Sequence, residues 1–278
     1  MIKELGSYWK IDNEGYIENE AHPNKISSDH KSAVEDVINE YKKQLGSDLH
    51  SIYIFGTVAR GNAVEEVSDL NSFALTSGDV SDTNQWAEQV TGNLECMHPY
   101  FSGIDMDVFC IEDVLKQPDK FNRVSFALKS DGACVYGEDL SQTIKPFRQC
   151  AAVANHEIIQ FRDKIEDAQR YLDRDLSKKE YSKYCRQAMK SLVRTGFSLV
   201  MIQEGKFTKD ILPGYYSFAK YYPHKKQDMR KAVEFVIQPP EQVEQAVELL
   251  DSFGSFLINA CDNWLDLNNR DRKLALEI

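Results

Sequence analysis

The sequence predicts an α/β domain at residues 1–145, with a small mixed sheet and flanking helices, followed by an all-α helical bundle at residues 146–278. In the first part, short runs of strand-forming residues alternate with amphipathic helical segments. After Pro146 the apolar residues recur almost wholly with the helical period, in five segments. Several such segments in succession are typical of a helical bundle.

The elements of the first domain follow from local patterns. After a hairpin-like lead-in at residues 1–27, apolar residues at helical spacing predict a helix that Ser28 or Asp29 caps and Gly46 ends. Alternating or continuous apolar runs predict the strands. The remaining predicted elements are strands at 52–55, 70–75 and 103–111, a helix around Trp86, Val90 and Leu94, a helix at 119–129, and a turn at 136–140 that leads out of the domain.

Glycine and proline residues separate the predicted helices of the bundle, and Pro239-Pro240 before Glu241 suits a helix entry. These helices cover residues 147–173, 178–203, 208–221, 225–237 and 241–267.

The composition is that of an ordinary soluble protein, with 42% hydrophobic and 28% charged residues. The first twenty residues are too charged for a signal peptide, and no apolar run is long enough to span a bilayer. We therefore expect a cytoplasmic protein without membrane contact. The six cysteines show neither close pairs nor metal-ligand spacing, which predicts reduced thiols.

Charge is divided unevenly along the chain. Residues 1–150 hold 13 Lys and Arg against 25 Asp and Glu, whereas residues 151–278 hold 20 against 19. An acidic first half disfavours a nucleic-acid track and favours metal ions, a small cationic partner, or both. Within the second half, residues 174–231 carry 14 basic and 5 acidic side chains. Arg186, Lys190 and Arg194 recur there at i, i+4 and i+8 of one helix face, which predicts either a solvated basic face or a basic wall able to grip a triphosphate.

The most informative stretch is IYIFGTVARGNAVEEVSDLNSFAL, residues 52–75. An apolar strand ends at Gly56 and is followed by the hydroxyl of Thr57, and Asp69 and Asn71 then fall on one face of the next strand. Oxygen-bearing side chains beside a glycine turn suit Mg²⁺ with a polyphosphate. A hairpin with polar residues on its wet face is the plainer interpretation of the same residues.

The whole pattern, a hydrophobic strand, Gly-Thr, Arg-Gly and Ser-Asp-Leu-Asn before a second strand, resembles the signature of the polymerase-beta-like nucleotidyltransferase superfamily. The resemblance implies transfer of a nucleoside monophosphate from a nucleoside triphosphate, with Mg²⁺ and ATP required. It implies a nucleotide site that includes Gly56, Thr57, Arg60 and Ser68, and a metal site that includes Asp69 and Asn71.

Two positions depart from this signature. The family normally has Ser where Thr57 stands, which keeps the hydroxyl, and Asp where Asn71 stands. Asparagine keeps one neutral oxygen and loses the charge, so a two-metal site would hold its cations more weakly. Asn71 is compatible with a natively impaired enzyme or with a change made to trap a substrate complex.

Asp105 and Asp107 alternate with apolar residues in GIDMDVFCI and so face the same way. Without the upstream signature they would be solvated carboxylates. The resemblance implies that one of them is the third carboxylate, a metal ligand or a base toward the acceptor hydroxyl. Both stay candidates, and spacing to residues 112–114 favours Asp105 slightly.

The segment RTGFSLVMIQEGKFTKD, Arg194 to Asp210, resembles a helix and turn of the streptomycin and spectinomycin adenylyltransferases. The resemblance implies that Arg194 and Lys209 contact the ATP phosphates, with Lys206 as the alternative to Lys209, although the spacing here is one residue shorter. It favours AMP transfer to an aminoglycoside-like molecule, an activity of the antibiotic-resistance type. A toxin-like enzyme acting on RNA or protein, and a catalytically weak nucleotide-binding module, are the alternatives.

Overall fold

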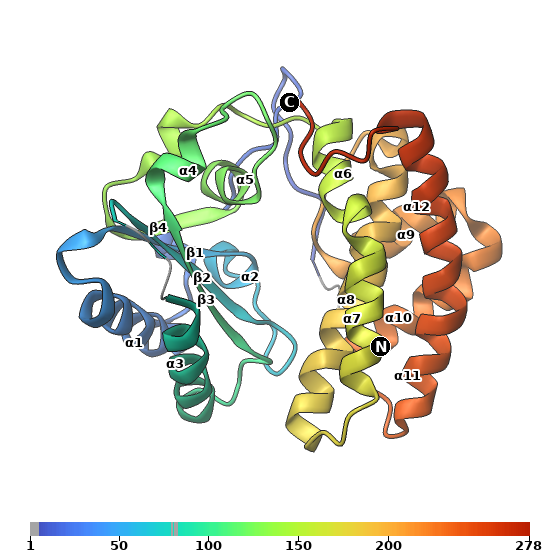
Figure 1. Cartoon of the computed structure of the whole chain (residues 1–278), viewed down its shortest axis with the longest axis horizontal. Helices are drawn as coiled ribbons and strands as arrows, with labels where there is room; N and C mark the ends of the chain where they lie inside the picture. Colours follow the sequence, from blue (N-terminus) through green and yellow to red (C-terminus); the bar gives the residue numbers. More distant parts are fainter. Residues whose placement is uncertain (1–5, 79, 81–82) are drawn as a thin grey trace. The chain divides into compact units, whose positions relative to one another are not determined.

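The computed structural model describes residues 6–78, 80 and 83–278. The chain divides into two compact units. Residues 18–147 form a unit around a sheet, and the described residues up to 17 join residues 148–278 in a helical unit (Figure 1). The predicted first domain, residues 1–145, ends close to residue 147 but also includes the first 17 residues, which cluster with the helical unit.

In its described residues, the sheet unit contains four strands in the order β3-β2-β1-β4. Strands β2 and β3 are parallel, whereas β1 is antiparallel to both β2 and β4, which confirms the predicted mixed sheet. The sequence predicts no strand at Gly132–Gly137, where β4 lies, and β4 overlaps the start of the turn predicted at 136–140. Its six residues begin and end with glycine, which weakens the strand signal. The strands are β1 (Leu49–Phe55), β2 (Leu70–Thr76), β3 (Ile104–Cys110) and β4 (Gly132–Gly137).

Helices α1 (Ser28–Leu45) and α3 (Thr83–Met97) cover one face of the sheet (Figure 1). Ser27 caps α1 by accepting a hydrogen bond from the Asp29 amide, one residue before the predicted cap, and Gly46 ends the helix as predicted. Burial of apolar side chains between these helices and the sheet supplies the main core of the unit. That core includes Val34, Val37, Ile52, Ile54, Leu70 and Ile104.

The opposite face of the sheet carries an aromatic cluster. Tyr53 stacks on Phe73 with ring centroids 5.2 Å apart, and Phe55 lies 5.7 Å from the same ring. Three short helices complete the unit: α2 (Thr57–Arg60), α4 (Ile111–Leu115) and α5 (Arg123–Ser130).

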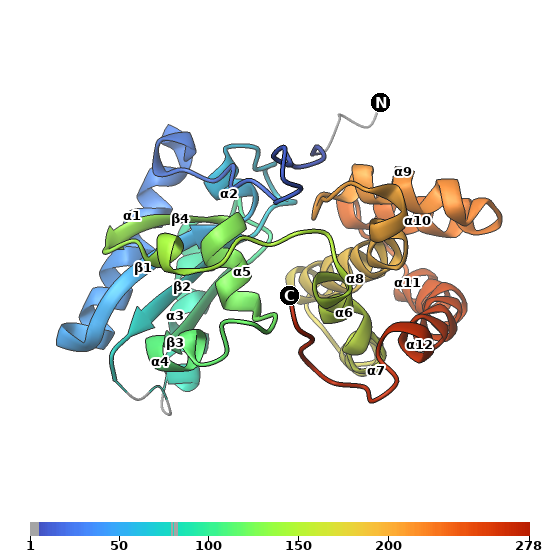
Figure 2. The same cartoon turned by 90° about the horizontal axis from the view of Figure 1, so that it is seen from above.

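The helical unit is arranged around α8 (Lys178–Glu204), which begins at a capping box between Ser177 and Glu180 and ends at the left-handed Gly205 (Figure 2). The predicted segment 147–173 is divided at Gln160, and the predicted segment 241–267 contains a π-helical stretch at Leu250–Gly254 between α11 and α12. The other helices are α6 (Ala151–Ile159), α7 (Phe161–Leu172), α9 (Ile211–Tyr221), α10 (Lys226–Ile237), α11 (Val243–Leu249) and α12 (Ser255–Asn268).

Residues 6–17 pack against the helices because backbone and ring contacts hold them there. The Trp9 amide donates to the Phe207 carbonyl at 2.9 Å, and the two rings meet edge to face at 5.0 Å. The Ser7 amide donates to the Asp210 carboxylate at 3.1 Å. These interactions tie the start of the chain to the loop between α8 and α9.

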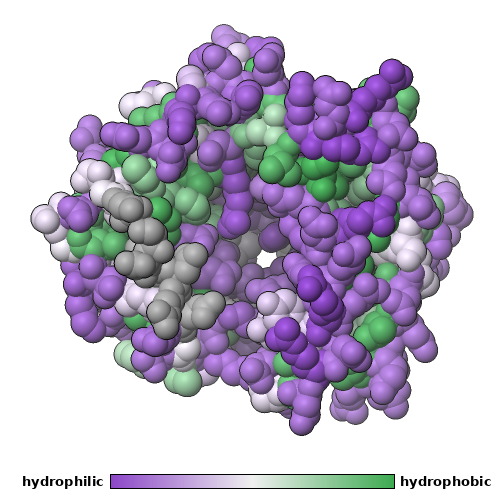
Figure 3. All heavy atoms as spheres, in the orientation of Figure 1, coloured by the Kyte–Doolittle hydropathy of each residue, from purple (hydrophilic) through white to green (hydrophobic). Residues whose placement is uncertain are grey.

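The surface that Figure 3 shows is mostly hydrophilic, with scattered apolar patches. No helix in the described ranges has the length and apolar character needed to cross a membrane. All six cysteines lie in the described part of the chain and are free there, and Cys185 and Cys261 are buried.

Candidate functional site

The predicted acidic residues meet where β2 and β3 run side by side. Asn71 pairs directly with Asp105 in the parallel ladder, and Phe73 pairs with Asp107. Directly paired residues share a face and side chains alternate along a strand, so Asn71, Asp105 and Asp107 project from the same face. Asp69 lies just before β2 and two residues before Asn71, so the same alternation of side chains puts it on this face. The sequence pattern of two polar pairs therefore becomes one polar cluster.

The glycine turn predicted to hold phosphate lies over this cluster. Phe55, the last residue of β1, pairs with Asn71. Gly56 then adopts φ 80° and ψ −150°, a conformation that favours glycine, and a methyl group at this position would lie 3.7 Å from the Asn71 amide nitrogen. Thr57 follows as the first residue of α2. The structure thus brings Gly56, Thr57 and Asn71 together.

A compact loop positions Asp69. Ser68 is buried, and its hydroxyl accepts a hydrogen bond from the Val64 amide at 2.9 Å. The Ser68 carbonyl accepts from the Ser102 amide at 3.0 Å, and the Ser102 hydroxyl donates to the Asp69 carboxylate. Ser68 therefore closes the loop, and Ser102 orients the carboxylate. Sequence reasoning missed Ser102 because a lone serine before Gly103 carries no distinguishing pattern.

Asp105 and Asp107 have different surroundings although they share a face. Asp105 is beside Asn71, whereas Asp107 is one pair further along the ladder, beside Phe73. Arg123, at the start of α5, places its guanidinium 3.8 Å from the Asp107 carboxylate, and both side chains are well exposed. Exposed ion pairs of this kind contribute little stability. No sequence pattern marked Arg123 as a neighbour of Asp107.

Arg60, predicted as a phosphate contact, is directed into the protein. Its Nη1 lies 2.8 Å from Asp131 Oδ1, and the two side chains are only 4% and 2% exposed. A buried charge needs such a partner because desolvation is costly. The guanidinium therefore fixes the end of α2 to the segment between α5 and β4.

Arg194, Lys209 and Lys206 all belong to the helical unit. Arg194 is exposed on α8, and Lys209 lies 5.7 Å over the Trp9 ring. Lys206 lies 4.5 Å over Tyr8 and 3.8 Å from Glu204.

Two of the three cations on the predicted basic face of α8, Arg186 and Lys190, are not free in solvent. Arg186 donates from Nε to the Val236 carbonyl at 3.1 Å and from Nη2 to the Ile237 carbonyl at 3.4 Å. It thereby caps the end of α10, where orphan carbonyls require donors. Lys190, one turn further along, is 8% exposed. Of Arg186, Lys190 and Arg194, only Arg194 has an exposed side chain.

The oxygen donors at the sheet edge suit one divalent cation. Asp69 and Asp105 supply carboxylates and Asn71 supplies an amide oxygen, which are ligand types that Mg²⁺ accepts together with water and phosphate. Among the residues whose side chains are described, no three His, Cys, Asp or Glu groups converge as a metal site. Asn71 in place of a carboxylate leaves this cluster with a smaller negative charge than two cations need.

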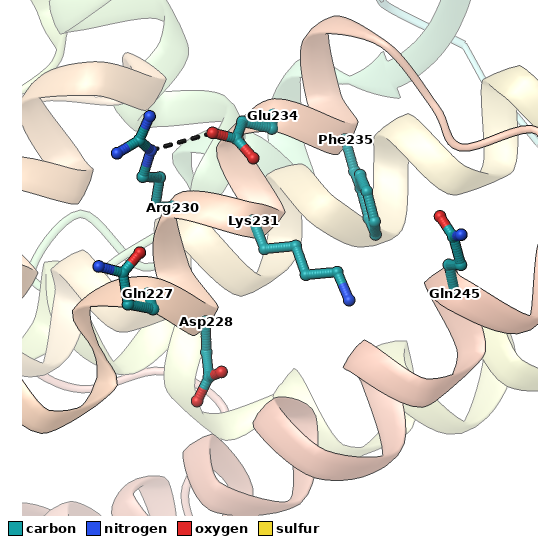
Figure 4. Close-up of a pocket in the computed structure, with 7 residues that line it drawn as sticks. All are labelled: Gln227, Asp228, Arg230, Lys231, Glu234, Phe235 and Gln245. Atoms are coloured by element: carbon teal, nitrogen blue, oxygen red, sulfur yellow. Dashed lines mark hydrogen bonds and ion pairs between the residues drawn. The ribbon is translucent and has the colours of Figure 1, made fainter.

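A separate surface pocket of about 450 Å³ lies on α10 and α11. Arg230 is paired with Glu234 at 2.9 Å, and Lys231 extends toward the Phe235 side of the pocket (Figure 4). The lining residues are Gln227, Asp228, Arg230, Lys231, Glu234, Phe235 and Gln245, none of which is a predicted site residue.

The mixed sheet followed by a helical region matches the architecture of a nucleotidyltransferase fold with a helical domain. The comparison is with the crystal structure of the spectinomycin adenyltransferase AAD(9) from Enterococcus faecialis, solved with ATP and spectinomycin. The match covers 84% of this chain and 99% of that one, with a TM-score of 0.56 and 14% sequence identity. At this identity the likeness establishes the fold alone. No protein-family model and no curated protein matches the sequence.

Proposed function

We propose that this protein is a Mg²⁺-dependent nucleotidyltransferase that moves AMP from ATP to an acceptor hydroxyl. The observation that carries the proposal is the pairing of Asn71 with Asp105 beneath the Gly56 turn. The nucleotidyltransferase-like fold supports the class of reaction.

Each residue of the cluster has a role in this proposal. Gly56 and Thr57 bind the β- and γ-phosphates through the turn between β1 and α2. Ser68 keeps the loop closed so that Asp69, oriented by Ser102, meets the triphosphate. Mg²⁺, held by Asp69 and the Asn71 amide oxygen with the Asp105 carboxylate beside them, would neutralise phosphate charge.

Asp105 is the residue that we assign to the acceptor. Its place beside Asn71 in the parallel ladder supports this choice over Asp107, which lies one pair further along, beside Phe73. The acceptor oxygen attacks the α-phosphorus, the bond from that phosphorus to the bridging oxygen breaks, and pyrophosphate leaves with the electron pair. The acceptor proton passes to the Asp105 carboxylate. Positioning and charge neutralisation supply most of the acceleration in such transfers.

A small cationic acceptor of the aminoglycoside type fits the charge of the chain. Residues 1–150 hold 25 acidic against 13 basic side chains, which favours a cation near the sheet unit. The AAD(9) structure was solved with spectinomycin, which supports the same acceptor class. RNA receives less support, since Arg186 is engaged with α10 and Lys190 is largely buried.

A nucleotide-binding module with little turnover is the second candidate, and Asn71 is the observation that favours it. The neutral amide removes one of the charges that align the acceptor, while Asp69 still serves nucleotide binding.

The test is to incubate the native protein and Asn71→Asp with α-phosphate-labelled ATP, Mg²⁺ and a panel of aminoglycosides, other small alcohols, tRNA and proteins. A mass increase of one AMP on one compound supports the transferase and identifies the acceptor. ATP binding without transfer by either protein would support the binding module instead.

A further inference from the structure

Two hydroxyl groups are buried beneath the proposed site, on the face of the sheet that α1 covers. Tyr41 of α1 and Ser72 of β2 are both fully buried in an otherwise apolar core. Their oxygens, Tyr41 Oη and Ser72 Oγ, lie 3.1 Å apart. A buried hydroxyl is costly unless it is hydrogen-bonded, and phenylalanine and alanine would fill most of the same space without that cost. The arrangement therefore calls for a reason other than packing.

Both hydroxyls reach the backbone of the two residues that carry the candidate carboxylates. Tyr41 donates to the Asp107 carbonyl at 3.0 Å, and Ser72 donates to the Asp105 carbonyl at 3.0 Å. Two hydroxyl protons are available for three oxygen contacts, so at any moment two of the three contacts carry a proton. The network links α1, β2 and β3 at the register that sets Asp105 beside Asn71.

Strand β3 needs such support because it lies at the edge of the four-stranded sheet and pairs with β2 only. The orientation of a peptide group and the direction of the Cα–Cβ bond beside it are coupled through φ and ψ. Hydrogen bonds that reach the Asp105 and Asp107 carbonyls from the side that α1 covers therefore constrain where the two carboxylates point on the opposite face.

Burial keeps the network intact. Burial raises the pKa of Tyr41, and the Asp107 and Asp105 carboxylates raise it further, while the Ser72 hydrogen bond opposes the rise. Tyr41 therefore remains a neutral donor throughout the physiological pH range.

We propose that Tyr41 and Ser72 are positioning residues that hold β3 so that the Asp105 carboxylate meets the acceptor hydroxyl and the cation, an inference that rests on the proposed function. Neither side chain touches the substrate, because both lie on the far face of the sheet. They act on the position of the Asp105 carboxylate. A displacement of a catalytic group by about 1 Å can lower the rate up to about a hundredfold.

The test uses Tyr41→Phe and Ser72→Ala, each made in the native chain and in Asn71→Asp. We expect each to lower the single-turnover rate of AMP transfer about tenfold, with the KM for ATP within about twofold of its parent. Two matched variants control for the loss of a buried hydroxyl. In Tyr53→Phe the lost hydroxyl contacts residues 138–140, and in Thr76→Val it contacts the Gly78 carbonyl at the other end of β2. Both controls should keep the rate of their parent.

A second readout is the affinity for Mn²⁺, followed by electron paramagnetic resonance with ATP present. Tyr41→Phe and Ser72→Ala should weaken Mn²⁺ binding several-fold, as should Asp105→Asn, whereas the two controls should not. Rates and Mn²⁺ affinities equal to those of the controls would overturn the positioning role. If neither native protein nor Asn71→Asp transfers AMP to any acceptor, the proposed function fails, and the Mn²⁺ comparison alone decides whether these hydroxyls position Asp105. Should Tyr41→Phe not fold, Ser72→Ala carries the same comparison.

Discussion

Arg60 and Asp131 form an ion pair with 2.8 Å between Nη1 and Oδ1, and both side chains are almost completely buried. The pair joins the end of α2 to the residue that follows α5. Removing one partner leaves an uncompensated buried charge, which is more damaging than removing both.

This pairing predicts that Arg60→Met lowers the free energy of unfolding by about 3–5 kcal/mol, and that Arg60→Met combined with Asp131→Leu recovers most of that loss. Urea unfolding measures both values. The double variant should also bind ATP as the native protein does. A loss of ATP affinity in a stable double variant would instead support the phosphate contact that the sequence predicts for Arg60.

Nucleotide binding should depend on Asp69 through the divalent cation. Asp69→Ala should weaken binding of MgATP by about tenfold or more, since a charge-assisted interaction contributes about 1.5–3 kcal/mol. Binding of metal-free ATP should change much less. Calorimetry on both nucleotide forms measures the difference, with Asp113→Ala, an exposed carboxylate of α4, as the control. Equal MgATP affinity in native protein and Asp69→Ala would contradict the assignment of Asp69.

Arg194 should contribute to nucleotide affinity if the resemblance of residues 194–210 to the adenylyltransferases holds. Arg194→Glu should weaken ATP binding by about tenfold or more. Arg194→Gln tests the loss of charge alone, and Lys226→Glu applies the same reversal to another exposed cation of the helical unit. An unchanged dissociation constant in a folded Arg194→Glu protein would contradict a role for Arg194 in nucleotide binding.

Glu157 of α6 makes stability depend on acid pH. Burial alone would raise its pKa, but Lys164, His156 and Arg194 outweigh burial and lower the pKa to about 2, with the Lys164 ammonium 2.9 Å away. A carboxyl group with a lowered folded-state pKa contributes stability above its unfolded pKa, near 4.5, and loses it as pH falls toward 2.

Glu157→Gln should therefore be less stable than the native protein at pH 7, by about 2 kcal/mol. The gap should close as the pH falls from about 5 to about 2. Thermal unfolding across that range measures it. Glu166→Gln, at an exposed position of α7, should show no comparable pH dependence. A gap that persists at pH 2 would exclude this electrostatic origin.

The fold was largely predictable because its elements carry local signals. Helix α1 shows apolar spacing between a serine cap and Gly46, and α8 shows the Ser177–Glu180 capping box. Strand β4 escaped because two glycines bound a short run that only pairing with β1 makes a strand. Residues 6–17 were placed with the sheet because nothing local in their sequence reveals the contact between Trp9 and Phe207.

Strand alternation and motif spacing predicted which residues belong to the candidate site, but not how these residues are arranged. They identify Asp69, Asn71, Asp105 and Asp107 as candidates, but not the register that sets Asp105 beside Asn71. Partners such as Ser102 and Arg123 come from distant segments and carry no pattern of their own. The burial of Arg60 against Asp131 likewise depends on a contact across 71 residues of sequence.

The central claim is that the Asp69, Asn71 and Asp105 cluster transfers AMP and that Asn71 limits the rate rather than ATP binding. Asp69 still meets the cation and phosphates in the ground state, whereas the missing charge at Asn71 acts on alignment of the acceptor. Single-turnover AMP transfer to a competent acceptor should be compared in the native protein, Asn71→Asp and Asn71→Asp combined with Asp105→Asn. We expect Asn71→Asp to raise the rate about a hundredfold or more and to change the ATP dissociation constant only a few-fold. Adding Asp105→Asn should abolish this gain in rate. Comparable rates in the native protein and Asn71→Asp, or a gain that survives replacement of Asp105, would contradict it.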